Sequence, residues 1–535
     1  MADIAIPYDS TSQILSRTAR WQVLFGAVLV QLILGTVYGY SVFWQPLEAE
    51  LWPPIMTAPQ VRTLQAAGET VPPGVTIVNQ ETDAARERDR RVGYLKYSFA
   101  ICLLSFAVSM IFAGRLQDAR GPRFTALWGG FILGLAFLVA GQMRFLATYY
   151  VCHAFLMGVL AVAALAVCDW LFRGLSRERY RVLNYLPLGL TTFVIVAGLT
   201  IGNRYLSNTT SDKLLLLWAT IGLLAGVGIG FAYVCPIAAL VKWFPQHKGL
   251  VSGVAVAGFG FGAYVFAWPE GIGAVGFIER HGIDTLFTTH GLISLTAVCA
   301  GGLLLRNPPA AGTKSASGGA SPEETLDRIT LLRSSKFYLV WLMFFSGAMA
   351  GLMVIGIMKP FVGDQLVDAA GRRGVFLDQA LRAALVRQGA TAVGILAIFN
   401  ALGRIAWGFF SDRIGRTGAL VLMFLFQSVT MLSLVMLASD WSLYAGAACV
   451  GFNFGGNFAL FPSLTADLFG SKRFGANYGK VFTSYGAAGV VGVWAGNTAR
   501  LWTGSFFAAF AMAAGLCLLS AILAVVLGRL RSEPT

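Results

Sequence analysis

An arginine in the middle of a long apolar run is the residue of this sequence with the clearest chemical meaning. Arg404 lies within the run Thr391 to Phe410, eight residues before Asp412. At 1.5 Å per residue, a helix places Arg404 about 12 Å deeper than Asp412, close to the centre of a hydrocarbon layer whose half-thickness is about 15 Å. Placing a guanidinium there costs at least about 2.5–3.5 kcal/mol, so a compensating anion is expected.

The sequence offers no fixed anion at the depth of Arg404. The acidic residues Glu270, Asp412 and Asp467 all lie near the ends of apolar runs. A mobile carboxylate is the expected partner, because the planar guanidinium can bind its two oxygens together. The alternative is that Arg404 bonds to carbonyl groups at helix ends or braces the inner gate.

Other reactive side chains form no recognisable site. The histidines have no HxxxH or HExxH spacing, and there is no nucleophile elbow or phosphate-binding loop. The cysteines lie in apolar stretches without CxxC spacing, so we expect them to be packing residues. The sequence therefore predicts no enzyme, no metal site and no cofactor.

The elements that must position Arg404 are membrane spans. Of the 535 residues, 56% are hydrophobic and 12% are charged, whereas about a quarter are charged in an ordinary soluble domain. Apolar runs of about 20 residues can cross the bilayer as helices. They lie near 21–44, 94–113, 124–143, 148–172, 183–203, 214–241, 249–269, 285–305, 337–358, 391–410, 419–438, 442–462, 479–498 and 502–528. The sequence predicts an all-α polytopic membrane protein with about fourteen spans.

The net charge of +14 is explained by the two sides of the membrane. If both termini are cytoplasmic, the short inner connections carry fourteen Lys and Arg residues, and the short outer connections carry five. We therefore expect cytoplasmic termini, a location in the plasma membrane, specifically the bacterial inner membrane, and no nucleic-acid partner. We also expect no removable signal peptide.

The two halves of the sequence repeat one another. Gly114, Asp118 and Gly121 recur 294 residues later as Gly408, Asp412 and Gly415. Pro236, Gly249 and Gly253 recur 226 residues later as Pro462, Gly475 and Gly479. The difference of 68 residues predicts two additional spans in the first half, 148–172 and 183–203.

The repeat predicts the domain organisation. We expect an N-terminal transmembrane half over 1–305, with the extra helix pair at about 148–203, a flexible cytoplasmic linker over 306–335, and a C-terminal half over 336–535. Residues 45–93 are expected to form an outer loop, whose charge run Glu81 to Arg91 is interpreted as a solvated face.

Each G-x-x-x-D-x-x-G segment has a physical interpretation. The first glycine permits close helix contact, the aspartate can accept from a helix N-terminus or an arginine, and the second glycine lets the chain turn. Gly114, Asp118 and Gly121, with Gly408, Asp412 and Gly415, are therefore candidate gating residues. This pattern resembles the signature loop of the major facilitator superfamily.

Three further segments narrow the resemblance. They are similar to segments of the oxalate/formate antiporter family: Tyr38 to Glu48, Lys242 to Gly249, and Phe461 to Gly470 with Asn477 to Gly479. The resemblance implies two six-helix repeats and a secondary transporter that works by alternating access. It also implies an aromatic cage around Arg404, which would exclude water and strengthen an ion pair. The implied cage residues are Tyr38, Tyr233, Phe454, Phe458 and Phe482.

One position departs from the family. This sequence has Tyr485 at a position where the oxalate transporter carries a lysine, which is the second cation of that transporter's site. We therefore expect a monocarboxylate substrate, such as formate, lactate or pyruvate. An oxalate/formate-type dicarboxylate exchanger is the alternative, and a carboxylate-sensing membrane receptor is the alternative of another class.

The sequence says less about how transport is coupled to other ions and about the role of the extra helix pair. His153 is interpreted as the only histidine inside a span, and we expect it and Asp169 to serve local packing or to lie at a helix end. Antiport, uniport and symport all stay open, as does the direction of transport. The extra pair is expected to lie outside the twelve-helix body, where it could contact lipid, another copy or a partner.

Overall fold

The computed structural model describes residues 9–143, 210–266, 273–308, 328–376, 378–503 and 506–532. The predicted extra pair, 148–172 and 183–203, lies outside these residues, as do His153, Asp169 and most of the predicted linker. The described elements are almost all helical, which agrees with the predicted all-α class.

The described part of the first half is almost entirely helical. Its membrane helices and adjoining segments are α1 (Asp9–Leu34), η1 (Gly35–Phe43), α2 (Trp44–Leu51), α4 (Glu81–Arg120), α5 (Pro122–Ala140), α8 (Thr210–Leu217), η2 (Trp218–Leu224), α9 (Ala225–Trp243), α10 (Lys248–Phe266), α11 (Ala274–His281) and α12 (Ile283–Leu304). A small unit of β1 (Ile55–Thr57), α3 (Ala58–Ala66) and β2 (Thr76–Val78) separates α2 from α4.

The second half is built in the same way. Its elements are α13 (Arg328–Arg333), α14 (Ser335–Arg372), α15 (Gln379–Ile414), α16 (Arg416–Ser433), η4 (Leu434–Met436), α17 (Asp440–Phe469), α18 (Phe474–Val481), α19 (Thr483–Thr503) and α20 (Phe507–Ser532).

Ten helices of the described segments are long and apolar enough to cross a membrane. Each agrees in position with one of the predicted spans. The predicted spans 442–462 and 479–498 lie in α17 and α18–α19, which are not among the ten. Buried asparagines such as Asn453 and Asn457 lower the hydropathy of α17, and a turn at Phe482 separates α18 from α19.

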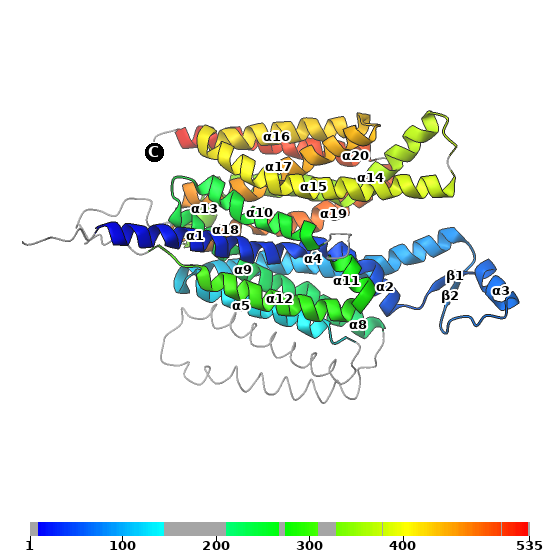
Figure 1. The fold of residues 1–535 in the computed structure, drawn as a ribbon. Coiled ribbons are helices and arrows are strands. Elements are labelled where there is room, and N and C mark those ends of the chain that lie inside the picture. The colour runs from blue at the N-terminus through cyan, green and yellow to red at the C-terminus, as the bar shows by residue number, and fades with distance from the viewer. Residues whose placement is uncertain are drawn as a thin grey trace, which may run out of the picture.

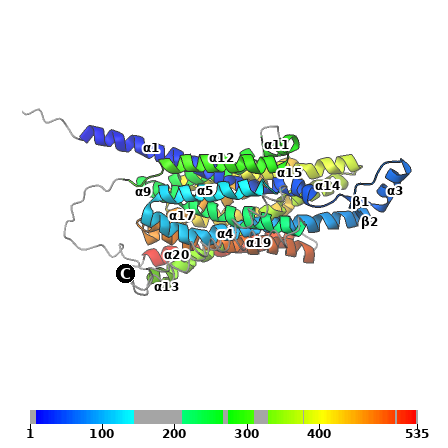
Figure 2. The ribbon, with the colours of Figure 1, turned by 90° about the horizontal axis from the view of Figure 1, so that it is seen from below.

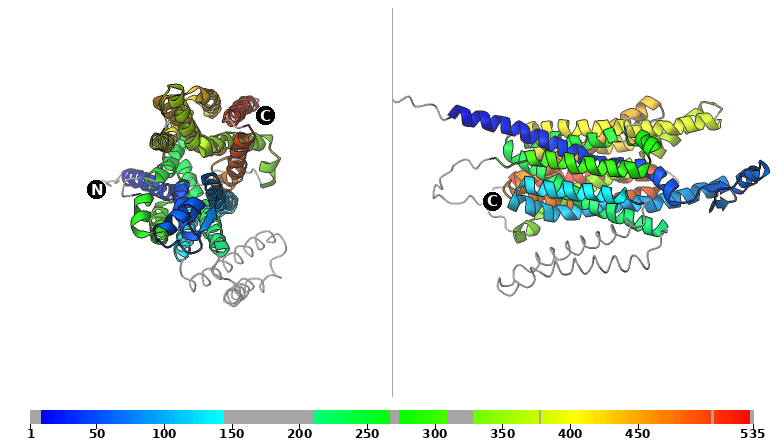
Figure 3. Two further views of the ribbon diagram at one scale, coloured as in Figure 1. Left: turned by 90° about the vertical axis from the view of Figure 1, so that its right-hand side faces the viewer. Right: turned by 60° about the horizontal axis from the view of Figure 1, so that its bottom comes forward.

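The helices form two bundles that lie side by side (Figures 1 and 3). Helices α1, α4, α5, α9 and α12 pack in one bundle, and α14, α15, α16, α17 and α20 pack in the other. Between them, α10 packs against α15, and α18 packs against α4. Each of these crossings joins a helix of the first half to one of the second.

Glycines allow the two crossings to be close. A Cβ on Gly114 would lie 1.9 Å from the carbonyl oxygen of Gly475, and a Cβ on Gly408 would lie 2.4 Å from that of Gly249. These four residues are two pairs of repeat equivalents, so the contacts are related by the repeat. Only glycine permits the backbones to approach this closely.

The outer connection 45–93 is more ordered than the sequence predicts. Strands β1 and β2 pair in parallel, and together with α3 they project beyond the helices at one end of the bundle (Figure 2). The charge run Glu81 to Arg91 is the first part of α4 rather than a loop.

The interpretation of that run as a solvated face is wrong for Arg91. This side chain is buried, and its guanidinium contacts Glu48 at 3.0 Å and Glu87 at 3.2 Å. It also donates to the Pro53 carbonyl and to the Thr76 hydroxyl. Arg91 therefore fastens the β1–α3–β2 unit to α4.

Candidate substrate site

Arg404 lies inside α15 and is fully buried. Its Nε donates to Oδ1 of Asn400, one turn earlier on the same helix, at 2.8 Å. Its Nη1 donates to the backbone carbonyl of Val256 in α10, across the boundary between the halves, at 2.5 Å. The alternative prediction for Arg404 is a bond to carbonyl groups at helix ends. Arg404 does bond to a backbone carbonyl, but that carbonyl lies in the interior of a helix.

The remaining nitrogen of Arg404 is chemically unsatisfied. Nη2 is buried and has no hydrogen-bond partner among the described residues. The guanidinium carbon lies 4.5 Å from the centre of the Phe458 ring and 5.7 Å from that of Phe259. Aromatic faces attract a cation but do not accept its N–H hydrogens as a carboxylate does. The described residues provide no ion pair for this charge.

The sequence-predicted aromatic residues come together around Arg404. Phe458 contacts the guanidinium directly and packs against the rings of Phe454 at 5.4 Å and Tyr485 at 5.2 Å. The Phe482 ring lies 5.0 Å from that of Tyr485 and 5.3 Å from that of Tyr233. These residues come from both halves of the chain, so their convergence depends on the packing of the two bundles.

Tyr38 and Tyr485 link the halves directly. Tyr38 belongs to the 3-10 segment η1, and Tyr485 lies in the first turn of α19. Their hydroxyl groups are hydrogen-bonded to one another. The position at which the related family carries a lysine is therefore a neutral hydroxyl, and that hydroxyl is already paired.

Several residues of this cluster were not predicted. The Phe259 ring lies beside those of Tyr38 at 5.2 Å and Tyr233 at 5.3 Å, in addition to its contact with Arg404. Phe344 stacks against Tyr485, and Tyr478 packs against Phe482. Phe259 could have been predicted from the sequence repeat, because the displacement of 226 residues makes it the equivalent of Tyr485.

His290 corrects the interpretation that His153 is the only histidine inside a span. It is buried within α12, and its Nε2 lies 3.1 Å from the hydroxyl of Thr36. Its ring packs against those of Phe137 and Phe266. No contact joins it to Arg404.

The two signature segments close one end of the bundle. The Asp412 carboxylate accepts from the backbone N–H groups of Gly249 at 3.0 Å and Leu250 at 2.8 Å, at the start of α10. The Asp118 carboxylate accepts from those of Gly475 at 3.2 Å and Ala476 at 2.8 Å, at the start of α18. Each aspartate thus caps a helix of the opposite half. We call this end of the molecule the signature-loop end.

The turns after these aspartates have the geometry that glycine favours. Gly121 has φ of +90°, and Gly415 has φ of +84°. Both residues end a long helix, α4 or α15, and start the next one. The second glycine of each segment therefore makes the turn.

The two caps differ in their charged partners. Arg416 pairs with Asp412 at 2.6 Å and with Asp467 at 2.9 Å, and Lys248 of the first half pairs with Asp467 at 2.8 Å. The residue equivalent to Arg416 beside Asp118 is Pro122, which has no charge. The Asp412 cap therefore belongs to a four-membered charge network, whereas Asp118 has Lys242 and Arg473 nearby.

Comparisons with known proteins agree with this architecture. The model of the Major Facilitator Superfamily matches residues 375–535. The oxalate:formate antiporter of Oxalobacter formigenes is 30% identical over 302 residues, which cover 54% of this chain and 67% of the antiporter. This chain belongs to the major facilitator superfamily. It is therefore a secondary transporter with multiple membrane spans, not an enzyme.

Other relatives extend the comparison. The MFS-type transporter YhjX of Escherichia coli is 25% identical over 88% of this chain and 86% of its own length. Apicoplast pyruvate carrier 1 of Toxoplasma gondii is 29% identical over 49% of this chain and 56% of the carrier. The solved proton:xylose symporter XylE shares the fold, with a TM-score of 0.55 at 12% identity and 95% coverage of both chains.

Proposed function

We propose that this transporter moves a small carboxylate with a single acidic group, such as formate, lactate or pyruvate, by alternating access around Arg404. The observation that carries the proposal is the buried guanidinium, whose Nη2 group has no partner among the described residues. A bound carboxylate would satisfy that group and neutralise the charge at the same time.

The site supports a monocarboxylate better than a dicarboxylate. Tyr485 and Tyr38 offer a neutral hydroxyl pair at the position where a second cation would be needed. A second carboxylate placed in this aromatic surrounding would be desolvated without an opposite charge, which is strongly unfavourable. The oxalate:formate antiporter among the relatives keeps a dicarboxylate exchanger as the second candidate.

Alternating access follows from the placement of the site and the caps. Arg404 and its aromatic neighbours lie between the halves, and Asp118 and Asp412 join the halves at the signature-loop end. Release of these caps would open that end, and their formation would close it. With cytoplasmic termini in a bacterial inner membrane, as the positive-inside rule favours, the closed end faces the cytoplasm.

Transport by purified protein tests the proposal. Proteoliposomes are preloaded with one unlabelled acid at a time, namely formate, lactate, pyruvate, acetate or oxalate. Uptake of each labelled acid from outside is then followed with and without an imposed pH gradient. Uptake of monocarboxylates in preference to oxalate is expected. Preference for oxalate would establish the dicarboxylate exchanger, and saturable binding without uptake would establish a receptor. The pH gradient separates proton-coupled transport from exchange.

A further inference from the structure

Four tyrosines surround Arg404 as two pairs, and each pair joins the two halves. Tyr38 of η1 is paired with Tyr485 of α19, and Tyr233 of α9 faces Tyr478 of α18. Tyr38 and Tyr233 pack against Phe259, whose ring lies 5.7 Å from the guanidinium carbon. Tyr233 and Tyr478 both pack against Phe482. The pairs differ in one respect, which is their hydrogen bonding.

The first pair makes a hydrogen bond of regular angle, and the second pair does not. The hydroxyls of Tyr38 and Tyr485 are hydrogen-bonded to one another. Those of Tyr233 and Tyr478 face one another without a hydrogen bond of regular geometry, although both side chains are almost completely buried. A buried hydroxyl without such a bond is costly, and its cost is recovered when an acceptor binds it.

The second pair is held firmly in place. The Tyr233 ring packs against Phe106 at 5.1 Å and Phe482 at 5.3 Å, and the Tyr478 ring packs against Phe482 at 5.7 Å. Nε2 of Gln31 donates to the backbone carbonyl of Tyr233 at 3.1 Å. The packing therefore fixes the positions of the two hydroxyl oxygens, while each O–H bond can still rotate towards an acceptor.

We infer that the substrate carboxylate binds between Arg404 Nη2 and the hydroxyls of Tyr233 and Tyr478, so that Tyr478 is a further specificity-determining residue. This inference rests on the proposed carboxylate transport. A carboxylate has two oxygens and about four acceptor positions, which is enough for these three donors. The first pair already uses one of its two O–H donors in its mutual bond, so it is not assigned the main contacts to the acidic group.

The inferred contact would bridge the halves. Tyr233 belongs to the first half, whereas Tyr478 and Arg404 belong to the second. Both tyrosines would donate to a charged acceptor, which makes stronger hydrogen bonds than a neutral one. The carboxylate would thus give the two hydroxyls a shared, charged acceptor that joins the halves.

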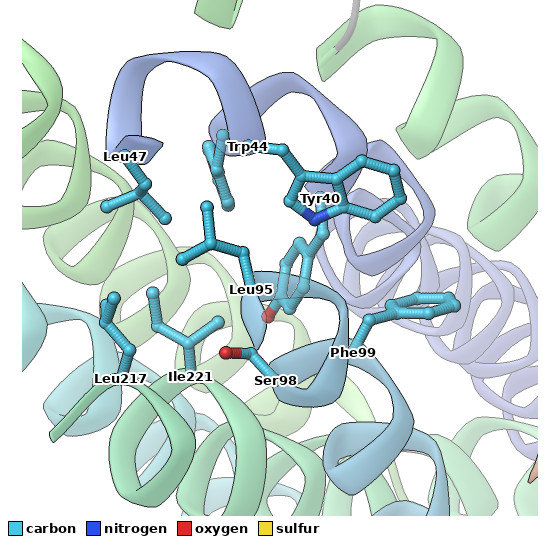
Figure 4. A pocket seen from close by; sticks show the side chains of 9 residues that line it. Tyr40, Trp44, Leu47, Leu95, Ser98, Phe99, Leu217 and Ile221 are labelled. Carbon is cyan, nitrogen blue, oxygen red and sulfur yellow. The ribbon is translucent and has the colours of Figure 1, made fainter. Parts of the chain in front are cut away.

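Substitution of the hydroxyls tests the inference. In proteoliposomes, Tyr478→Phe and Tyr233→Phe keep the rings but remove the donors, and each is expected to raise the KM for a transported monocarboxylate about tenfold or more while the maximal rate changes less. Tyr40→Phe is the matched control, because Tyr40 is also buried but lines a separate small pocket with Trp44, Leu95 and Phe99 (Figure 4). Its KM is expected to equal that of the wild type.

The outcomes separate this inference from the proposed function. An unchanged KM in Tyr478→Phe, with the wild type active, would overturn the role of Tyr478 and leave carboxylate transport intact. Wild-type protein that neither binds nor moves any carboxylate would overturn both. If Tyr478→Phe does not fold, the KM of Tyr233→Phe decides, because the two hydroxyls are inferred to bind the same group.

Discussion

Replacing Asp412 with asparagine is expected to open the signature-loop end of this transporter. Asp412 accepts from two backbone N–H groups at the start of α10 and pairs with Arg416 at 2.6 Å. Asparagine keeps the size of the side chain and one acceptor oxygen, but it loses the negative charge and the second acceptor. The closed conformation therefore loses stabilisation of its bonds to α10, which the open conformation does not make.

The size of the effect follows from the bonds that are lost. A hydrogen bond to a charged group contributes about 1.5–3 kcal/mol, and each 1.4 kcal/mol changes an equilibrium tenfold. Asp412→Asn is thus expected to shift the closed-to-open ratio by about tenfold to a hundredfold. Asp118→Asn removes a similar cap. Because the Asp412–Arg416 pair lies within the second half and is kept when the halves separate, the two variants are expected to cause shifts of similar size.

Distances between the halves provide the measurement. Spin labels at Arg120 and Arg413, which are exposed residues of the two signature segments, report separation by pulsed electron resonance. Asp412→Asn and Asp118→Asn are each expected to populate a longer distance. The reasoning is refuted if either variant leaves the distance distribution unchanged.

Three further substitutions test other parts of the structure. Tyr485→Lys is expected to raise the ratio of oxalate to formate uptake by about tenfold or more, since it adds a second cation, and an unchanged ratio would contradict the charge argument. Gly114→Ala places a Cβ 1.9 Å from the Gly475 carbonyl oxygen and is expected to reduce the maximal uptake rate severely. Gly418→Ala is the control, because its Cβ would meet nothing within 4 Å, and its maximal rate is expected to equal that of the wild type. Equal rates in the two variants would refute the role of Gly114 in the close crossing. Arg91→Ala leaves two carboxylates without their buried partner and is expected to speed hydrogen exchange in β1 and β2 without changing the KM, and unchanged exchange would refute its fastening role.

Much of the body of this transporter is predictable from the sequence. Runs of about 20 apolar residues identify the membrane helices, because the bilayer fixes their length. The depth of Arg404 follows from the helical rise, and its need for an anion follows from the cost of a buried charge. The repeated glycines and aspartates indicate the signature loops, since only glycine permits the close crossings that bring Asp118 and Asp412 to the opposite half.

The remaining features depend on contacts that local pattern does not encode. Arg91 lies in a charge run that has the composition of a solvated surface, and its burial depends on Glu48, which is 43 residues earlier in the chain. Tyr478 and Phe259 have the composition of ordinary packing residues. Their position beside Arg404 arises only when α10 and α18 cross the boundary between the halves.

Uptake by Arg404 variants tests the central claim most directly. Arg404→Lys keeps the positive charge but not the two-pronged donor geometry, and Arg404→Ala removes both. Monocarboxylate uptake into proteoliposomes is expected to fall strongly in Arg404→Lys and to be abolished in Arg404→Ala, with both proteins folded and inserted as the wild type is. Uptake at the wild-type rate and KM in both variants would contradict the account of Arg404 as the group that binds the transported carboxylate.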